Sequence, residues 1–249
     1  GLVMLPLLLP AFLKPLPSAY SALPPPADSA VLGPEATPSP LAKQFEETSY
    51  YLKDVDFVSA NVGWAVGEPH WDQARKEYAV TIIKTIDGGV TWSAQSADIA
   101  ETLRNVDFVD ANNGWAVGTN GAILHTGDGG EHWTRQTAGS TDEFRGVAFL
   151  NATQGWATSF HGTHNDYSGK ADDWRGTIWY TSNGGATWQA QTLPANASLL
   201  NRIKFIDPEH GWAVGVKYTG DDRYGYPQHA GIVYRTVNGG QTWEEFYSP

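Results

Sequence analysis

Residues 103–133 read LRNVDFVDANNGWAVGTNGAILHTGDGGEHW, and this stretch decides the fold. It contains an alternating strand, a turn, a Gly-Trp-Ala strand and a third strand that ends in a Thr-x-Asp-Gly-Gly turn before a tryptophan. Alternation of apolar and polar residues is typical of half-buried strands, and a glycine pair supplies the positive φ that a tight turn needs. The stretch therefore predicts a meander of short antiparallel strands.

The same unit occurs four times in the chain. The Gly-Trp strands carry Trp64, Trp115, Trp156 and Trp212, at spacings of 51, 41 and 56 residues. Each glycine-pair turn carries an aspartate or asparagine and a tryptophan: Asp87 and Trp92, Asp128 and Trp133, Asn183 and Trp188, Asn238 and Trp243. We interpret these turn residues as structural, because a large ring after a tight turn packs between neighbouring sheets. Four strands per unit predict an all-β protein, a β-propeller with four-stranded antiparallel blades. The four repeats would form a four-bladed ring or a partial arc of a larger propeller.

Composition excludes several classes of protein. The chain has 249 residues, a formal net charge of −11 and no cysteine. An acidic surface argues against a nucleic-acid partner, which binds by replacing the counterions of phosphates with basic side chains. The absence of cysteine excludes disulfide scaffolds, thiolate zinc sites and cysteine nucleophiles.

The first 44 residues differ from the repeats. Residues 2–13 read LVMLPLLLPAFL, which is too short to span a membrane and has the size of the apolar part of a secretory signal. Residues 23–44 are rich in proline and are interpreted as a linker. We expect a truncated signal-like segment at 1–22, a linker at 23–44 and propeller repeats at 45–249. The mature chain would have no membrane span and an extracytoplasmic location, in a periplasm, a thylakoid lumen or the secreted fraction.

The repeats resemble a known family. The turns look like the Asp-boxes of bacterial neuraminidases. The Val-x-Phe strand, the Gly-Trp-Ala-Val-Gly strand and the box together resemble the photosystem II stability and assembly factors of cyanobacteria and chloroplasts and their bacterial relatives. The resemblance covers about residues 45–249 and implies a non-catalytic propeller. It also implies a basic patch that docks a newly made reaction-centre subunit, so the expected partner is a protein of the membrane-protein-precursor kind.

The chain departs from that family in the number of its repeats. The family's members are seven-bladed, whereas this sequence holds four units, so we expect a fragment or one subunit of a completed ring. An incomplete arc would leave two sheet edges exposed, which promotes self-association.

The copies diverge most between their second and third strands. This connection takes seven residues in the second copy and 17, 21 and 20 residues in the first, third and fourth copies. We expect these longer connections to be loops at the end of the blades opposite the glycine-pair turns. Their aromatic residues are candidates for partner contact, because they offer large area and lose little entropy: Trp71, Tyr167, Trp174, Tyr224 and Tyr226.

A cation recurs near the start of each first strand. Four residues before the strand phenylalanine stand Lys53, Arg104, Arg145 and Asn201, and Arg202 follows Asn201. Ring symmetry would bring Lys53, Arg104, Arg145 and Arg202 to the mouth of the central channel. The pattern predicts a basic face, rimmed by the aromatic connections, that binds an anionic or carboxylate-bearing partner. The alternative is a set of independent surface cations.

Rival chemistries stay open at this point. A sialidase-like enzyme would use three arginines for a carboxylate, an acid/base and a Tyr–Glu pair, for which Glu101, Glu143 and Tyr167 are candidates without distinguishing context. A carbohydrate-binding protein is a second alternative. The loop residues His161, His164, Asp166, Asp172, Asp173, Asp221 and Asp222 match no metal-binding spacing and are interpreted as solvated side chains. We expect no enzyme activity, no cofactor and no metal.

Overall fold

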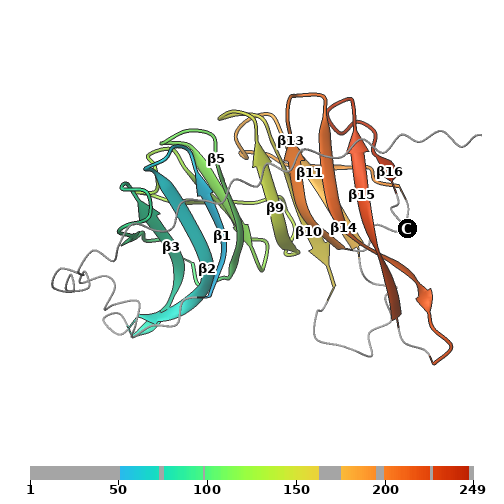
Figure 1. Cartoon of the computed structure of the whole chain (residues 1–249), viewed down its shortest axis with the longest axis horizontal. Helices are drawn as coiled ribbons and strands as arrows, with labels where there is room; N and C mark the ends of the chain where they lie inside the picture. The colour runs from blue at the N-terminus through green and yellow to red at the C-terminus, as the bar shows by residue number, and fades with distance from the viewer. Residues whose placement is uncertain are drawn as a thin grey trace, which may run out of the picture. The chain divides into compact units, whose positions relative to one another are not determined.

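The computed structural model describes residues 51–72, 76–97, 99–162, 175–194, 199–224 and 227–246. The expected signal-like segment and linker lie outside these residues. The chain divides into two units, residues 1–37 and 38–249, and all the described secondary structure lies in the second. Every described element is a β-strand, and the strands form four antiparallel sheets of four strands each, so the predicted all-β propeller architecture is confirmed (Figure 1).

Each sheet contains one sequence repeat, and its strands pair in chain order. The first sheet has β1 (Leu52–Phe57), β2 (Gly63–Asp72), β3 (Glu77–Thr85) and β4 (Ser93–Ala94). The second has β5 (Leu103–Phe108), β6 (Gly114–Gly118), β7 (Ile123–Thr126) and β8 (Thr134–Gln136). The third has β9 (Glu143–Phe149), β10 (Gly155–His161), β11 (Arg175–Thr181) and β12 (Gln189–Gln191). The fourth has β13 (Leu199–Phe205), β14 (Gly211–Asp221), β15 (Pro227–Thr236) and β16 (Glu244–Phe246).

Aromatic stacking joins each sheet to the next. Trp64 stacks on Phe108 of the following sheet with ring centroids 3.5 Å apart. Trp115 on Phe149 and Trp156 on Phe205 repeat this contact at the same 3.5 Å. Each of these tryptophans also donates its indole N–H to a glycine carbonyl in the next sheet's turn, at 3.0, 3.1 and 3.3 Å. The repeated Trp and Phe positions are therefore the two halves of one interface, which the chain forms three times.

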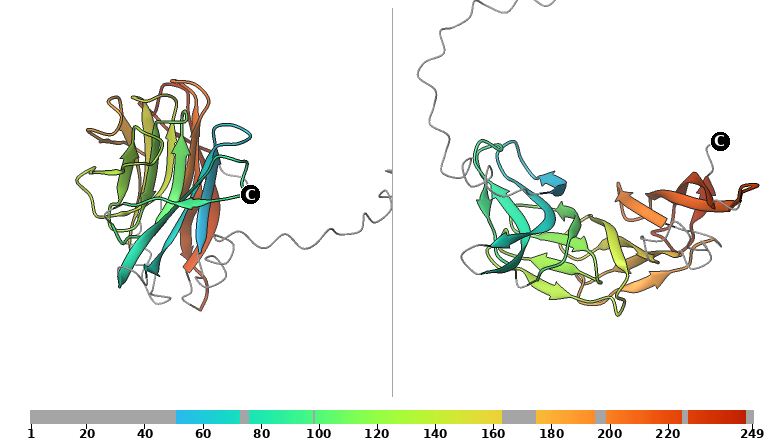
Figure 2. Two further views of the ribbon diagram at one scale, coloured as in Figure 1. Left: turned by 90° about the vertical axis from the view of Figure 1, so that its left-hand side faces the viewer. Right: turned by 90° about the horizontal axis from the view of Figure 1, so that it is seen from below.

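Three apolar cores lie between the four sheets. Figure 2 shows the sheets following one another in chain order, with the first and fourth at the two ends. Among the described residues, no ring stacks on Phe57 of the first sheet, which is 42% exposed, and Trp212 of the fourth sheet is only partly buried. The described residues thus form a partial arc and not a closed four-bladed ring.

The glycine-pair turns share one hydrogen-bond pattern. In the second repeat, Thr126 Oγ1 donates to Asp128 and accepts the N–H of Gly130 at 2.8 Å. The other three turns repeat both bonds, with Asp87, Asn183 or Asn238 in place of Asp128. Both glycines of each turn have positive φ, which a side chain would strain. This end of each sheet is a fixed corner of the scaffold.

The long connections are strands over much of their length, and our expectation of loops was wrong for two of them. β2 pairs with β3 as far as Asp72 and Glu77, and β14 pairs with β15 as far as Asp221 and Pro227. Backbone pairing satisfies the polar groups of these segments, which a loop would leave to water. In Figure 1 both hairpins reach beyond the sheets at the same end.

Candidate functional site

A β-bulge sets the direction of the repeated cations. Pairing between the first and second strands skips one residue in every sheet, and the skipped residues are Lys53, Arg104, Arg145 and Asn201. An extra residue on one strand falls outside the alternation of the pleat, so its side chain is re-aimed. The bulge therefore takes the position four residues before the phenylalanine out of the regular strand pairing in all four repeats.

The bulges lie at the end of the sheets from which the long hairpins extend. Leu52 pairs with Gly67, Glu143 with Phe160 and Leu199 with Val216, so the first strands begin where the second strands lead into the hairpins. The glycine-pair turns are at the opposite end, because Phe57 pairs with Gly63 and Gly63 with Thr85. The cations and the variable connections therefore share one end of the sheets.

The structure brings three of the four predicted cations together. Arg104 Nε and Arg145 Nε lie 3.0 Å and 2.9 Å from the same oxygen, Glu143 Oε1. Arg145 also donates to Asn201 Oδ1 at 3.2 Å, and Arg202 donates to the carbonyl of Arg145 at 2.8 Å. We call Arg104, Arg145, Arg202 and Glu143 the arginine cluster. It spans the first strands of the second, third and fourth sheets.

Lys53 has a different partner. Its Nζ lies 2.7 Å from Glu68 Oε1, at the base of the β2–β3 hairpin. In the same sheet, Asp54 lies 3.8 Å from Arg202, so an acid of the first sheet faces the arginine cluster. The bulged position therefore makes two kinds of ion pair. Lys53 pairs within its own sheet, with Glu68, whereas Arg104 pairs with Glu143 of the next sheet.

Burial and neighbouring charges act on Arg145. Burial lowers the pKa of Arg145 below its usual range, the Glu143 carboxylate opposes this, and Arg104 and Arg202 lower it further. Arg104 and Arg202 thus lie close enough to act on the charge of Arg145, and the three guanidinium groups concentrate positive charge in an acidic chain. Arg145 also lies over the ring of Phe160, 5.6 Å from its centroid.

The aromatic candidates divide into described and undescribed residues. Trp71 on β2 and Tyr78 on β3 contact each other edge to face with ring centroids 5.3 Å apart, and both are exposed. Tyr224 is exposed in the β14–β15 hairpin, with Arg223 over its ring. Tyr167, Trp174 and Tyr226 lie outside the described residues. The described aromatics are thus accessible for contact at the hairpin end.

Acidic side chains line the first strands and tie neighbouring sheets together. Asp56 Oδ2 accepts the backbone N–H of Phe108, and Asp107 Oδ2 accepts that of Phe149, both at 2.7 Å. Burial raises the pKa of Asp107 to about 6; Asp56 and Asp54 add to the shift, while the Phe149 hydrogen bond and Lys204 oppose it. Burial raises the pKa of Asp56 as well. The repeats in the sequence did not single out Asp56 and Asp107 as candidates.

A hollow of about 400 Å³ adjoins the arginine cluster. Glu143 and Phe160 line it, together with Thr119 and Asn120 of the short β6–β7 turn and His161 at the end of β10. His161 Nδ1 lies 2.8 Å from Asp142 Oδ1. From the sequence, Glu143 is only one of several candidate acids. One signal does distinguish it: Glu143 stands six residues before the strand phenylalanine, where the other repeats have the uncharged residues Tyr51, Thr102 and Leu199.

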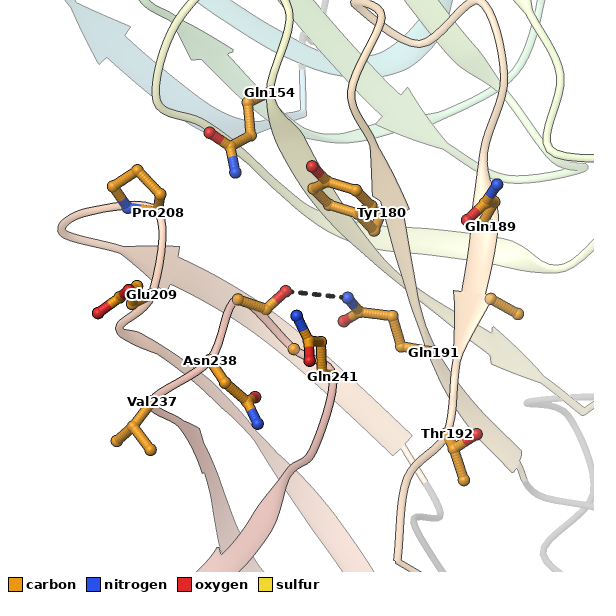
Figure 3. Close-up of a pocket in the computed structure, with 13 residues that line it drawn as sticks. Gln154, Tyr180, Gln189, Gln191, Thr192, Pro208, Glu209, Val237, Asn238 and Gln241 are labelled. Carbon is orange, nitrogen blue, oxygen red and sulfur yellow. Dashed lines mark hydrogen bonds between the residues drawn. The ribbon is translucent and has the colours of Figure 1, made fainter.

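A second hollow lies at the glycine-pair end, between the third and fourth sheets (Figure 3). Its volume is about 620 Å³, and its lining is rich in amides, including Gln154, Gln189 and Gln241 beside the ring of Tyr180. Gln191 donates to the carbonyl of Gly239 at 3.1 Å and accepts from Trp243, so this amide holds the turn of the fourth sheet. It is a groove between a strand edge and a turn.

The requirements of a metal site and of a membrane-spanning helix are not met by the described residues. Within them, no group of three or more acidic or histidine side chains is arranged to hold a metal ion. His164, Asp166, Asp172 and Asp173 lie outside them. No helix in the part of the chain that the structure describes has the length and apolarity needed to cross a membrane.

Comparison with known proteins identifies the family. A family model described as photosynthesis system II assembly factor YCF48 matches residues 38–193, which include the first three repeats. The chain belongs to this family. The resemblance noted in the repeats is thereby confirmed, and the matched residues contain the first-strand bulges at Lys53, Arg104 and Arg145.

Individual members of the YCF48 family share only limited sequence identity with this chain. The chain is 30% identical over 94 residues to the photosystem II stability/assembly factor HCF136, chloroplastic, of Oryza sativa subsp. japonica, which covers 35% of this chain and 20% of that protein. The match thus spans about a fifth of the length of this curated relative. The structure of YCF48 from Cyanidioschyzon merolae matches with a TM-score of 0.53 and 20% identity over 81% of this chain and 57% of that one, which supports the fold. A YCF48 structure with a bound D1 peptide matches with a TM-score of 0.45 and 18% identity, over 80% of this chain and 82% of that one.

Proposed function

We propose that this chain is a non-catalytic assembly factor that docks a protein partner through its hairpin end. The partner would be a precursor of a photosystem II membrane protein, bound outside the cytoplasm after export by the segment at residues 1–22. Membership of the YCF48 family supports the assembly role. The observation that carries the docking site is the gathering of Arg104, Arg145 and Arg202 from three sheets at one end.

The chemistry of the arginine cluster favours a carboxylate ligand. Guanidinium groups bind carboxylates in a planar, two-bonded geometry, and they keep their charge even when they are partly buried. Exposed aromatic rings at Trp71, Tyr78 and Tyr224 add apolar area on the neighbouring hairpins. Binding would thus combine a charged anchor at the first strands with contacts from the hairpins; Lys53, Tyr167, Trp174 and Tyr226 complete the proposed surface.

Glu101 and Glu143, the two candidate acids of a sialidase-like enzyme, are both paired with arginines. Burial opposes ionisation of Glu101, but the hydrogen bond and charge of Arg135 outweigh it and lower the pKa of Glu101. A general acid needs a raised pKa. Glu143 is paired with two guanidinium groups, at 3.0 Å from Arg104 Nε and 2.9 Å from Arg145 Nε. These contacts support a binding role over a sialidase-like reaction.

A peptide-binding measurement tests the proposal. The D1 peptide known from the solved YCF48 complex serves as a fluorescent probe for the purified 249-residue chain. We expect Arg104→Gln combined with Arg145→Gln to weaken binding by about tenfold or more, because two charge-assisted contacts are lost. Arg235→Gln is the matched control, since Arg235 pairs with Trp212 nearer the glycine-pair end. Equal affinity in all three proteins would contradict the proposal.

Self-association belongs to the proposal as well. The first sheet carries a largely apolar hollow, which is lined by Leu52, Val55, Ala65, Ile83 and Trp92 together with Lys53 and Asp54. Exposed apolar surface of this kind favours association with another apolar face. Sedimentation of the 249-residue chain over a range of concentrations measures this, and a single monomeric species at all concentrations would contradict it.

Glycan binding is the second candidate function. The groove of Figure 3 favours it, because amide side chains beside the Tyr180 ring can hydrogen-bond and stack on a sugar. Glycan-array binding that is lost in Gln241→Ala and retained in the Arg104/Arg145 variant would support this function. Binding of the D1 peptide with no glycan signal would support the assembly role instead.

A further inference from the structure

Glu143 already occupies the place that a partner's carboxylate would take. Its Oε1 lies 3.0 Å from Arg104 Nε and 2.9 Å from Arg145 Nε, and all three side chains are largely buried. The carboxylate belongs to the same strand as Arg145 and reaches across to the neighbouring sheet. The chain therefore supplies its own anion to the arginine cluster.

The fit between Glu143 and the arginines is incomplete. Arg104 Nε, Arg145 Nε and Glu143 Oε1 are buried and have no hydrogen-bond partner, although their distances suit ion pairs. The atoms are close enough for charge attraction, but they are not aligned for donation from N–H to oxygen. A poorly aligned contact recovers less of the cost of burying these polar atoms, so a better-aligned carboxylate would be favoured at this position.

The adjoining hollow gives Glu143 a place to go. Glu143 lines this space of about 400 Å³ together with Thr119, Asn120 and His161. The hollow is open because β6 and β7 form the shortest second-to-third-strand hairpin of the four described sheets, so the second sheet has no long hairpin beside the third. A rotation of the Glu143 side chain toward the hollow would free both guanidinium groups, and an extended segment has room to approach along the same path.

We propose that Glu143 is an internal competitor for the partner. In the free protein it pairs with Arg104 and Arg145, and a carboxylate on an extended peptide segment displaces it into the hollow on binding. This inference rests on the proposed docking function of the arginine cluster. It adds the chemical class of the anchor, a peptide carboxylate, and a residue that sets the affinity by competing with it.

The test is a substitution that improves binding. Glu143→Gln removes the competing charge and keeps the shape, so the D1 peptide should bind about three- to tenfold more tightly at low salt. The gain should shrink as the salt concentration rises, because salt weakens the attraction between the peptide carboxylate and the freed guanidinium groups. Glu101→Gln is the matched control, because it removes the same charge from an acid that pairs with Arg135. A D1 peptide whose carboxylates are converted to amides should show no gain.

Each outcome decides between the two proposals. If the natural chain binds the peptide and Glu143→Gln binds equally or more weakly, Glu143 is not a competitor, and the docking function stands. If neither protein binds, the docking function itself fails. A gain of the same size in Glu101→Gln would assign the effect to net charge and overturn the competition.

A second variant covers the case in which Glu143→Gln does not fold. Glu143→Asp keeps the charge and retracts it by one methylene group, so it should give a smaller gain in affinity than the glutamine variant. Circular dichroism and the melting temperature establish folding for each protein before binding is measured. Weaker binding by a folded Glu143→Asp would overturn the inference.

Discussion

Asp107 should make the protein more stable in mild acid than at neutral pH. The folded carboxyl has a pKa of about 6, raised by burial, whereas its ordinary value is 3.8. Between these two values the folded chain binds a proton that the unfolded chain does not bind, so a falling pH favours the folded state. The gain begins as the pH falls through about 6 and is complete below 3.8.

The size of the effect follows from the shift. A difference of about two pKa units corresponds to about 3 kcal/mol at 1.36 kcal/mol per unit. Asp107 retains some contact with water, so we expect about 2 kcal/mol. Asp107→Asn removes the charge and keeps an oxygen for the Phe149 N–H, which Asp107 now accepts at 2.7 Å. The variant should therefore gain about this amount of stability at pH 7 and lose the acid-linked gain between pH 7 and pH 4.5.

Urea unfolding followed by tryptophan fluorescence measures both quantities at pH 7 and pH 4.5. Asp110→Asn is a suitable control, because Asp110 caps the turn through Asn112 and Asn113 and these hydrogen bonds lower the pKa of Asp110. That variant should lose stability at pH 7. The reasoning is refuted if Asp107→Asn is less stable than the natural chain at pH 7, or if its stability changes with pH as much as before.

Two further substitutions test the packing between sheets. Trp115→Ala should cost about 3–5 kcal/mol of unfolding free energy, because a buried ring stacked on Phe149 is lost, and Trp212→Ala should cost less than half of that. Equal losses in urea unfolding would contradict the three-core arrangement. Gly114→Ala should lower the melting temperature sharply, because an added Cβ would overlap the Phe108 ring, whereas Gly231→Ala has open space and should change it little. A well-tolerated alanine at Gly114 would contradict this close approach.

The sequence predicted the scaffold because the scaffold repeats. The phenylalanine and tryptophan of the second repeat, Phe108 and Trp115, have equivalents at the same spacing in every other repeat. A residue type that is kept in all four repeats indicates a structural role. The stack of Trp64 on Phe108 was not predicted, since spacing within one copy does not say which neighbouring copy a ring meets. That information lies in the geometry between sheets, which emerges only when the sheets pack.

The candidate site was predicted less completely for the same reason. Arg104 and Arg145 were found because they share a register position, but Glu143 occurs in one repeat only and has no counterpart to compare. Its role depends on two distances to arginines of two strands. The hairpin strands were missed because residues 68–78 mix polar and aromatic residues without clean alternation, and their pairing is decided by the strands that they continue.

The repeated bulge explains how a uniform scaffold can carry a specific site. It takes Lys53, Arg104, Arg145 and Asn201 out of the regular pairing at the same point of each sheet, and the four side chains have three different chemistries. Because the bulged residue lies outside the regular ladder, its side chain can change without disturbing the stacked rings between the sheets. The bulged residues of the third and fourth sheets contact each other, because Arg145 donates a hydrogen bond to Asn201. A cation in place of Asn201 would repel Arg145. A position that the fold repeats in every sheet is thus free to vary in charge, and the proposed docking function depends on that variation.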